Sequence, residues 1–548
     1  MNQAKGIYTS PAVRTPSVNQ LGELAARLGL DVSSGELEDF QSVLQDSFAG
    51  YNVLEKYPEP LPAVKYPRLP GYRPPVEDNP YNAWYYKTDI KGAESGLLAG
   101  KRLAIKDNVA VGGVPMMNGS KLMEGYTPEF DATVVTRILD SGGRIVGKAN
   151  CESLCLSGAS FTSALGPVLN YCDQSRSAGG SSSGSAVLVA SGEVDMAIGG
   201  DQGGSIRIPA SWNGVVGLKP TWGLVPYTGA MSLEPALDHL GPITRTVHDC
   251  ALLLEAIAGL DDGLDCRQPA NLTVPKYTDA LTGDLAGIKV AILKEGFDVS
   301  EPDVAELVRD AAFKLKSAGA TVEEVSIPMH KDSQAVFGPV CMEGAYQHVI
   351  ENAGIAFGQK CFQPTSIHDH FLNAIKARPN DMPSAVKLVS LYGLYMKEYY
   401  GNRYYMKAIN VARTLTQEYN KALEMHSVLI MPTIPIKALK LPPEDVSLKE
   451  YLKDAGAGAS TGNTAAFDIT GHPALTINAG FSQNLPVGMM IVGKHFDEST
   501  VLKVAYAYER IRDLKIEVYT YAQIRDAKPE KLACKVQGQL TVTRLLLL

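Results

Sequence analysis

Short apolar runs that alternate with helical segments from residue 102 onward constrain the fold of this chain more than any other feature. The runs end in glycine or in polar turns, and helical stretches such as residues 132–139 and 185–191 lie between them. This alternation predicts an α/β fold with helices on both faces of a sheet. We expect strands at residues 102–105, 144–147, 196–199, 289–293, 321–327, 428–431, 474–478 and 488–492.

The first 80 residues follow a different pattern. Leu21, Leu24 and Leu28 recur at helical spacing, and Ser33 is placed to cap a second helix. Eight prolines then fall between residues 57 and 81. Because proline fixes φ and lacks an N–H donor, that stretch cannot enter a helix interior or a central strand. We expect residues 1–80 to form a helical unit with a proline-rich connector.

The remaining chain is expected to divide into three parts. A first part of the core spans residues 81–300, a helical cap spans 301–425, and 426–548 completes the core and adds a tail. The tail ends in four leucines, too few to span a bilayer. Tyrosines crowd in the cap, which is consistent with an aromatic-lined pocket. They are Tyr392, Tyr395, Tyr399, Tyr400, Tyr404 and Tyr405.

Charge and composition exclude several classes of function. The 548 residues include 51 Lys and Arg against 59 Asp and Glu, for a net charge of −8. This balance argues against nucleic acid or an anionic membrane as a partner, since both attract basic surfaces. The N-terminus lacks the apolar run of a secretory signal, and no stretch reaches the length of a membrane helix, so we expect a cytoplasmic protein.

The cysteines and histidines do not predict a metal site. Cys151 and Cys155 are four residues apart, but no further Cys or His stands near them, so we expect two small buried thiols. His368 and His370 lie two apart in a segment that reads as helical or looped, where they point different ways. We expect neither a metal nor another cofactor.

The segment from residue 177 to 221 is the most unusual part of the sequence. Two glycine–serine clusters, at 177–185 and 199–205, flank one helix of small residues. A flexible linker would not enclose apolar runs, and a phosphate-binding loop needs a lysine that is missing after Gly184. The remaining interpretation is a loop that exposes backbone amides beside hydroxyl groups. Acyl-transfer chemistry uses this arrangement.

Residues 180–184 also fit Gly-x-Ser-x-Gly, the nucleophile elbow of α/β-hydrolases, with Ser182 at its centre. That elbow must follow a strand directly and lead into a helix. The preceding residues, 170–176, are polar and loop-like. We therefore interpret the match as a chance product of a serine-rich run.

The same segment resembles the signature of the amidase signature family, which hydrolyses amides with a Ser-Ser-Lys triad. The matching elements are Gly-Gly-Ser-Ser-x-Gly-Ser at 179–185, Asp-x-Gly-Gly-Ser-Ile-Arg-x-Pro-Ala at 201–210 and Gly-Val-Val-Gly-Leu-Lys-Pro-Thr at 214–221. Weaker similarity extends from about residue 100 to 495. The resemblance implies a large mixed sheet covered by helices on both faces.

Carried over position by position, the resemblance implies that Ser205 is the nucleophile, Ser181 the bridging serine and Lys106 the base. It also implies a cis peptide bond before Ser181. The backbone amides of residues 202–205 match the family's oxyanion hole, whose members here are Gln202, Gly203, Gly204 and Ser205.

General chemistry supports these roles. A serine hydroxyl needs a neighbour to take its proton, and a lysine accepts one only when burial lowers its pKa. Lys106 ends an apolar run that predicts a buried strand, and we expect Asp107 and Asn108 to be its partners.

Three further residues are expected to support the site. Ser182 is interpreted as a turn or helix-cap residue that also bonds within the site. Asp201 and Arg207 flank the nucleophile, and a charge-assisted bond between them would fix its turn.

The chain departs from the commoner family pattern at residues 200–202, where Gly-Asp-Gln replaces Thr-Asp-Thr or Thr-Asp-Ile. With the N-terminal helices, this is similar to the bacterial amidases linked to nitrile metabolism. The similarity implies a homodimer and small aliphatic or aromatic amides as substrates, with carbamates split by related enzymes. One alternative is the amidase-type subunit of a tRNA-dependent glutamine amidotransferase. A second is a non-catalytic scaffold, but the complete set of Lys106, Ser181 and Ser205 argues against it.

Overall fold

The computed structural model describes residues 12–355, 357–456 and 461–512. The chain divides into two compact units, Met1–Pro62 and Ala63–Leu548. The four C-terminal leucines lie outside the described residues.

The N-terminal unit contains two helices, as the sequence predicts. Helix α1 spans Val18–Leu28 and α2 spans Ser34–Leu54. Each begins with a capping box, in which a serine side chain accepts from a backbone N–H three residues ahead and a Gln or Glu side chain bonds back. Neither helix buries a residue. Local capping therefore defines these helices, and tertiary packing contributes little.

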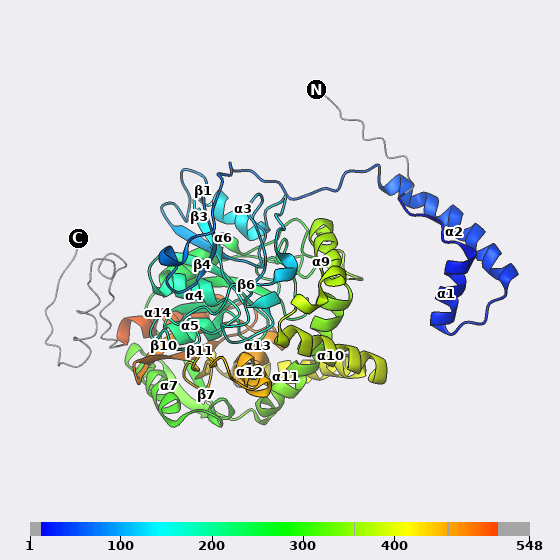
Figure 1. Ribbon diagram of the computed structural model, residues 1–548. Coiled ribbons are helices and arrows are strands. Elements are labelled where there is room, and N and C mark those ends of the chain that lie inside the picture. The colour runs from blue at the N-terminus through cyan, green and yellow to red at the C-terminus, as the bar shows by residue number, and fades with distance from the viewer. Residues whose placement is uncertain (1–11, 356, 457–460, 513–548) are drawn as a thin grey trace. The chain divides into compact units, whose positions relative to one another are not determined.

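The second unit is built on one mixed sheet of eleven strands (Figure 1). Pairing is parallel from β3 through β2 to β4 and from β8 through β7 to β9, and antiparallel elsewhere. The strand order is β1-β3-β2-β4-β6-β5-β10-β11-β9-β7-β8. The strands are β1 Trp84–Lys91, β2 Arg102–Lys106, β3 Arg144–Ala149, β4 Met196–Asp201, β5 Val216–Lys219, β6 His239–Thr244, β7 Lys289–Leu293, β8 Thr321–Val325, β9 Val428–Pro432, β10 Ala474–Ser482 and β11 Leu485–Val492.

All eight expected strands are present, and the mixed sheet confirms the predicted fold class. Strands β1, β5 and β6 were not expected from the sequence. Strand β5 has only four residues and ends on a lysine, and β6 contains Gly241 and Pro242, which disfavour strands. Both are fully buried between other strands, so tertiary pairing overrides their local preference.

Helices cover both faces of the sheet. Along β2, Leu103 and Ile105 join one core cluster, which includes residues of α3, α6, α7 and α14, whereas Ala104 joins another, with α4 and α5. Because alternate side chains of a strand point to opposite faces, these clusters lie on opposite sides of β2. The helices of this unit are α3 Thr133–Asp140, α4 Ser183–Ala190, α5 Arg207–Asn213, α6 Val247–Ile257, α7 Pro302–Lys314, α8 Ser333–Ala345, α9 Thr365–Ala377, α10 Ser384–Tyr400, α11 Arg403–Met425, α12 Leu448–Ala455, α13 Gly462–Ile469 and α14 Glu498–Ile511.

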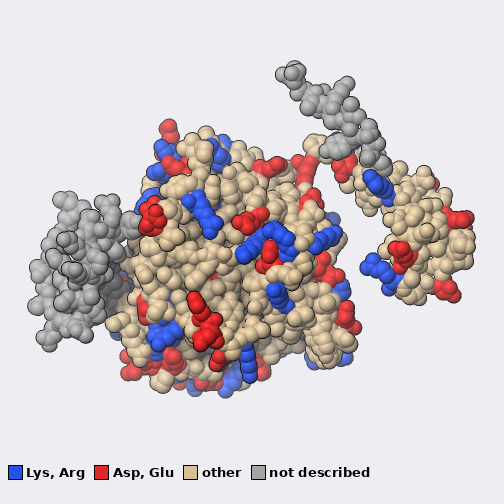
Figure 2. Space-filling model, in the orientation of Figure 1, with Lys and Arg blue, Asp and Glu red and all other residues tan. Residues whose placement is uncertain are grey.

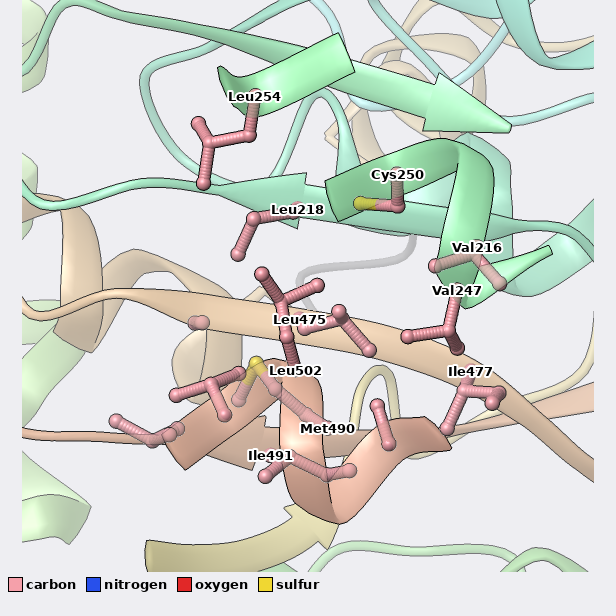
Figure 3. Packing of buried hydrophobic residues seen from close by; sticks show 14 of the residues in the cluster. Val216, Leu218, Val247, Cys250, Leu254, Leu475, Ile477, Met490, Ile491 and Leu502 are labelled. Atoms are coloured by element: carbon pink, nitrogen blue, oxygen red, sulfur yellow. The ribbon is translucent and has the colours of Figure 1, made fainter. Parts of the chain in front are cut away.

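The larger core cluster is apolar and closely packed (Figure 3). Leu218 of β5 and Leu475 of β10 lie between the side chains of α6 and those of α14. Side chains such as Leu254 and Leu502 are completely buried there. This packing holds the strands in place, and so fixes the position of the strand ends at the edge of the sheet.

The proline-rich connector is extended, as expected, apart from one short 3₁₀ turn at Val76–Asp78. Tyr72 within it forms an isolated antiparallel bridge with Lys87 of β1. Lys87 lies in an outer strand, where proline-rich neighbours are tolerated.

Helices α8–α11 gather at one side of the sheet, in the segment expected to form a cap (Figure 1). The expectation of an aromatic-lined pocket is wrong for most of its tyrosines. Tyr392, Tyr395, Tyr399, Tyr400 and Tyr404 are exposed on the helix surfaces and pack partly on one another. Helical spacing places them on the outer face, which the sequence pattern did not reveal.

Acidic and basic side chains are interspersed on the face shown in Figure 2. Within the described ranges, none of the helices combines the length and the apolar character needed to cross a lipid bilayer. His368 and His370 both fall on α9, as helical residues.

Candidate active site

Lys106 is the last residue of β2 and is completely buried. Its Nζ lies 2.8 Å from Ser181 Oγ and 3.2 Å from the carbonyl oxygen of Gly200. The carbonyl oxygen can only accept a hydrogen bond, so Nζ donates to it. The strand end therefore directs the Lys106 side chain at the Ser181 hydroxyl.

The main chain before Ser181 requires glycine. A Cβ atom at Gly180 would collide with the carbonyl oxygen of Ala159, closer than any side chain tolerates. The Gly180–Ser181 peptide bond is cis, in agreement with the resemblance. The Glu152 N–H donates to the Ser181 carbonyl oxygen at 3.2 Å. These contacts fix the direction of the Ser181 side chain.

Ser205 lies in the turn between β4 and α5. The N–H of Ser182 donates to its carbonyl oxygen at 3.2 Å, which holds the two serine segments side by side. The residue is 7% exposed, and within the described part of the chain its hydroxyl has no hydrogen-bond partner. A free hydroxyl at a cavity surface is the feature that a nucleophile needs.

The backbone N–H groups of this turn point in two directions. We expected the Gly204 N–H to belong to the oxyanion hole, and it does not. That N–H donates to Asp201 Oδ1 at 2.6 Å, so it faces the protein interior instead of an oxyanion. Over the described residues, the N–H groups of Gln202, Gly203 and Ser205 have no hydrogen-bond partner. Gly204 has φ +130°, and a Cβ there would lie 2.5 Å from Thr464 Oγ1. The turn thus requires glycine and leaves three amides free.

Asp201 and Arg207 form the expected charge-assisted pair. Arg207 Nε donates to Asp201 Oδ2 at 3.0 Å, and Nη2 donates to Oδ1 at 3.1 Å. Asp201 Oδ2 also accepts from the Ile206 N–H at 3.0 Å. Burial alone would raise the pKa of Asp201, but the charge and hydrogen bonds of Arg207 hold it well below its usual range. This pair clamps both ends of the catalytic turn.

Asp468 of α13 completes this buried cluster, and no pattern in the sequence pointed to it. Arg207 Nη2 donates to Asp468 Oδ2 at 2.7 Å, and both side chains are fully buried. Burial and the neighbouring charge of Asp201 raise the pKa of Asp468 well above its ordinary value. Asp468 is more than 250 positions from Asp201 and belongs to no motif, so only folding brings them together.

The expected pairing of Asp107 with Lys106 is wrong. Asp107 Oδ1 binds Lys148 Nζ at 2.8 Å, and its Oδ2 accepts the N–H groups of Met117 and Asn118. Neighbouring residues at a strand end point to opposite sides, which directs Asp107 away from Lys106. Asn108 donates to the Tyr227 hydroxyl at 3.3 Å. Asp107 therefore supports the site through the main chain and does not pair with Lys106.

Both cysteines are buried, as expected, but they touch the site. Their thiols donate to Asn118 Oδ1 at 3.5 Å from Cys151 and 3.4 Å from Cys155. A hydrogen bond with Cys151, the charge of Lys106 and the Ser181 hydroxyl lower the pKa of the Cys155 thiol. Sequence spacing revealed the burial of this pair but not its contact with Lys106.

Ser182 is fixed structurally and is not free to attack a substrate. Its Oγ donates to the Gly200 carbonyl oxygen at 3.0 Å and accepts from the Gly200 N–H at 3.1 Å. It stands at the N-cap of α4 but makes no side-chain capping bond. No strand precedes it within the described residues 170–181, as a nucleophile elbow would require.

Ser205 opens on a cavity of about 330 Å³. Gln202, Gly203 and Cys155 share this wall, and the rest comes from α8, α10, α12 and neighbouring loops. The described residues that line it include no Asp, Glu, Lys, Arg or His. Its larger apolar side chains are Ile208, Leu233, Phe337, Met342, Leu388, Val389 and Leu452. The cavity therefore suits an uncharged, mainly apolar group.

Comparisons with known proteins agree with this geometry. Residues 77–502 match the model of the Amidase family. The chain is similar to an enantioselective amidase of Rhodococcus rhodochrous, with 44% identity over 495 residues that cover 89% of this chain and 95% of that protein. It is also similar to a glutamyl-tRNA(Gln) amidotransferase component of Methanosarcina mazei, with 38% identity over 431 residues, or 78% of this chain and 87% of that one.

Among solved structures, a glutamyl-tRNA(Gln) amidotransferase component of Thermotoga maritima is similar in fold. The TM-score is 0.66 at 31% sequence identity, and the match covers 81% of this chain and 90% of that chain. The similarity supports the sheet architecture.

Proposed function

The chain belongs to the amidase family of hydrolases that act on amide C–N bonds, and we propose that it cleaves small uncharged amides with an apolar acyl group. The products are a carboxylate and ammonia. The observation that carries this proposal is the 2.8 Å contact of buried Lys106 Nζ with Ser181 Oγ, beside the uncharged cavity on which Ser205 opens.

In the proposed reaction, Ser205 Oγ attacks the amide carbon while its proton passes to Ser181, whose own proton passes to Lys106. The C–N bond then breaks, and Ser181 returns a proton to the departing nitrogen. Water attacks the resulting ester of Ser205 along the same proton route and releases the carboxylate. The 2.8 Å contact between Lys106 Nζ and Ser181 Oγ supports this route.

The amides of Gln202, Gly203 and Ser205 serve as oxyanion donors in this proposal, since they are free of other partners among the described residues. Gly204 is not an oxyanion donor in this proposal, because its N–H already donates to Asp201. The buried Asp201–Arg207 pair keeps the turn in place and reduces the reorganisation that the transition state requires.

The cavity limits the substrate class. Helices α8, α10 and α12 supply apolar side chains that accommodate an aliphatic or aromatic acyl group, and the helical segment thus acts as the cap. Carbamates share the uncharged carbonyl centre and belong to the same class of candidates.

Glutamine hydrolysis within an amidotransferase is the second candidate, favoured by the similarity to the amidotransferase components. Free glutamine carries an ammonium and a carboxylate group, and a pocket without a charged side chain does not offset the cost of their desolvation. The described lining of the cavity contains no such partner. The simple amidase is therefore the better-supported function.

A substrate panel tests the choice. The purified full chain is assayed with benzamide, propionamide, ethyl carbamate and glutamine at equal concentrations, with ammonia release as the measurement. We expect benzamide to exceed glutamine in kcat/KM by at least a hundredfold, and Lys106→Met to abolish both reactions. A preference for glutamine would reverse the assignment.

The N-terminal unit serves dimerisation in this proposal. No residue of α1 or α2 is buried, and Leu28, Phe40 and Leu54 are exposed. Exposed apolar side chains on helices of this kind are typical of surfaces that a partner covers. Light scattering of the full chain and of a Leu28→Glu, Phe40→Glu double variant tests this proposal. We expect the wild type to be a dimer and the variant to be a monomer. A monomeric wild type would contradict the proposal.

A further inference from the structure

The side chain of Gln202 is held by its nitrogen end only. Nε2 donates to the Tyr227 hydroxyl at 2.9 Å and to Asp238 Oδ1 at 3.0 Å. The residue is only 3% exposed, and its carbonyl oxygen Oε1 has no hydrogen-bond partner among the described residues. Buried amide oxygens are rarely left without a donor, so this one requires an explanation.

The neighbours of Gln202 decide which end of its amide lies where. Asp238 Oδ1 already accepts from the Leu233 N–H at 3.2 Å, and its Oδ2 accepts from the Ser232 hydroxyl. The Tyr227 hydroxyl donates to the Met231 carbonyl oxygen at 3.4 Å. Both groups therefore offer acceptors to Gln202, which only the NH₂ end can satisfy. A flipped amide would place oxygen against oxygen.

With Nε2 fixed on this side, Oε1 diverges from Asp238 and Tyr227. Gln202 lines the cavity on which Ser205 opens, and its main chain begins the turn that carries the free amides. The apolar side chains of that cavity have no N–H to offer. Since none of the described groups donates to Oε1, a molecule bound beside Ser205 can supply the N–H donor.

We propose that Gln202 is a specificity-determining residue whose Oε1 accepts a hydrogen bond from an N–H of the bound substrate, so that the site selects amides over the corresponding esters. This rests on the proposed amide hydrolysis. A primary amide has two N–H groups, and the proton relay uses neither of them, because Ser181 delivers its proton to the lone pair of the nitrogen. In an ester the leaving atom is an oxygen that carries no hydrogen. Oε1 then has no hydrogen-bond donor and lies opposite a lone pair of that oxygen. Sites built around a buried polar group discriminate strongly against analogues that leave it unpaired.

The test compares benzamide with methyl benzoate, which share one acyl group and differ in the leaving atom. The ratio of their kcat/KM values is measured for the wild type, Gln202→Met and Gln202→Glu. Methionine removes the acceptor, and we expect the amide-to-ester ratio to fall at least tenfold, through loss of amide turnover. Glutamate retains the acceptor, and a proton shared with Asp238 replaces the lost N–H donor, so we expect a ratio within threefold of the wild type.

Gln334→Met provides a matched control. Gln334 lines the same cavity, but its Oε1 accepts from the Thr461 hydroxyl at 3.3 Å. We expect this variant to leave the amide-to-ester ratio within threefold, whatever its effect on the overall rate.

The outcomes are distinguishable. If Gln202→Met lowers both reactions in parallel, or if Gln334→Met changes the ratio as much, Gln202 is merely structural and the inference is overturned. If the wild type hydrolyses neither compound nor the other amides of the panel, the proposed function itself fails.

Discussion

The turn over residues 201–207 has two faces that are built differently. On the inner face, Asp201, Arg207 and Asp468 share one hydrogen-bonded ion cluster that is completely buried. On the cavity face, the Ser205 hydroxyl and the Gln202 carbonyl oxygen have no partner among the described residues. The inner face therefore supplies rigidity, and the cavity face retains the unpaired groups that a substrate can use.

The largest effect is expected on the cavity face. Ser205→Ala removes the nucleophile, and we expect amide turnover to fall by about 10⁴-fold or more. The free energy of unfolding is expected to stay within about 0.5 kcal/mol, because the hydroxyl makes no hydrogen bond to the described residues. Ammonia release and denaturant titration are the two measurements. Substantial residual turnover would show that another group attacks.

On the inner face, the effect is expected in stability. Arg207→Met leaves two carboxyl groups buried without their cation, and we expect the free energy of unfolding to fall by about 3–5 kcal/mol. Turnover falls as well, because Asp201 no longer holds the turn. Denaturant titration measures the first effect.

Lys421→Met is the control for this change. The Lys421–Glu418 pair lies at the surface, where such pairs contribute about 0–1 kcal/mol. If Arg207→Met costs no more than this control, the two faces of the turn are not as different as their geometry indicates.

A smaller, pH-dependent effect is expected at Lys219, which lies behind the inner face. Burial lowers its pKa to about 7, and its Nζ contacts His239 Nε2 at 3.2 Å. Between about pH 7 and 10 the unfolded chain binds more protons at this site than the folded chain, so its contribution to stability rises with pH.

Lys219→Met removes this dependence. Relative to the variant, we expect the wild type to gain about 2 kcal/mol in unfolding free energy from pH 7 to pH 9. Denaturant titration of both proteins at the two pH values is the measurement. A difference that stays constant, or that runs in the opposite direction, would contradict a depressed pKa at Lys219.

The smallest effect is expected at Ser182, whose hydroxyl bonds to the main chain of Gly200. Ser182→Ala is expected to cost about 1–2 kcal/mol of stability and to leave turnover measurable. A fluorophosphonate probe should label Ser205 in this variant. Labelling of Ser182 in the wild type would instead restore the α/β-hydrolase interpretation.

Much of this architecture was predictable because it is local. Eight strands follow from short apolar runs, and the N-terminal helices follow from leucine spacing and serine caps. The segments of Ser181 and Ser205 follow from a contiguous motif whose glycines are required by close contacts, as at Gly180. Lys106 ends a separate apolar run that predicts a strand. The roles of these three residues stay predictions until the variants above are measured.

Other features were not predictable from neighbours in the chain. Asp107 follows Lys106 in sequence but pairs with Lys148, and Gly204 turns its N–H inward to Asp201. Tyr392, Tyr395, Tyr399, Tyr400 and Tyr404 are exposed, although the number of tyrosines in this segment indicated an aromatic pocket. Each outcome depends on which side of an element faces the core.

The amino-acid sequence by itself determined the alternating elements, the family to which they belong and the three residues that carry the proposed chemistry. Periodicity and contiguous motifs encode these, because they record the conformations of adjacent residues. Only the tertiary structure decided that Asp468 completes the ion cluster, that the described part of the cavity wall includes no Asp, Glu, Lys, Arg or His, and that one oxygen of Gln202 is left without a donor among the described residues. Such contacts join residues far apart in the chain, and their energies exist only once packing brings the groups together.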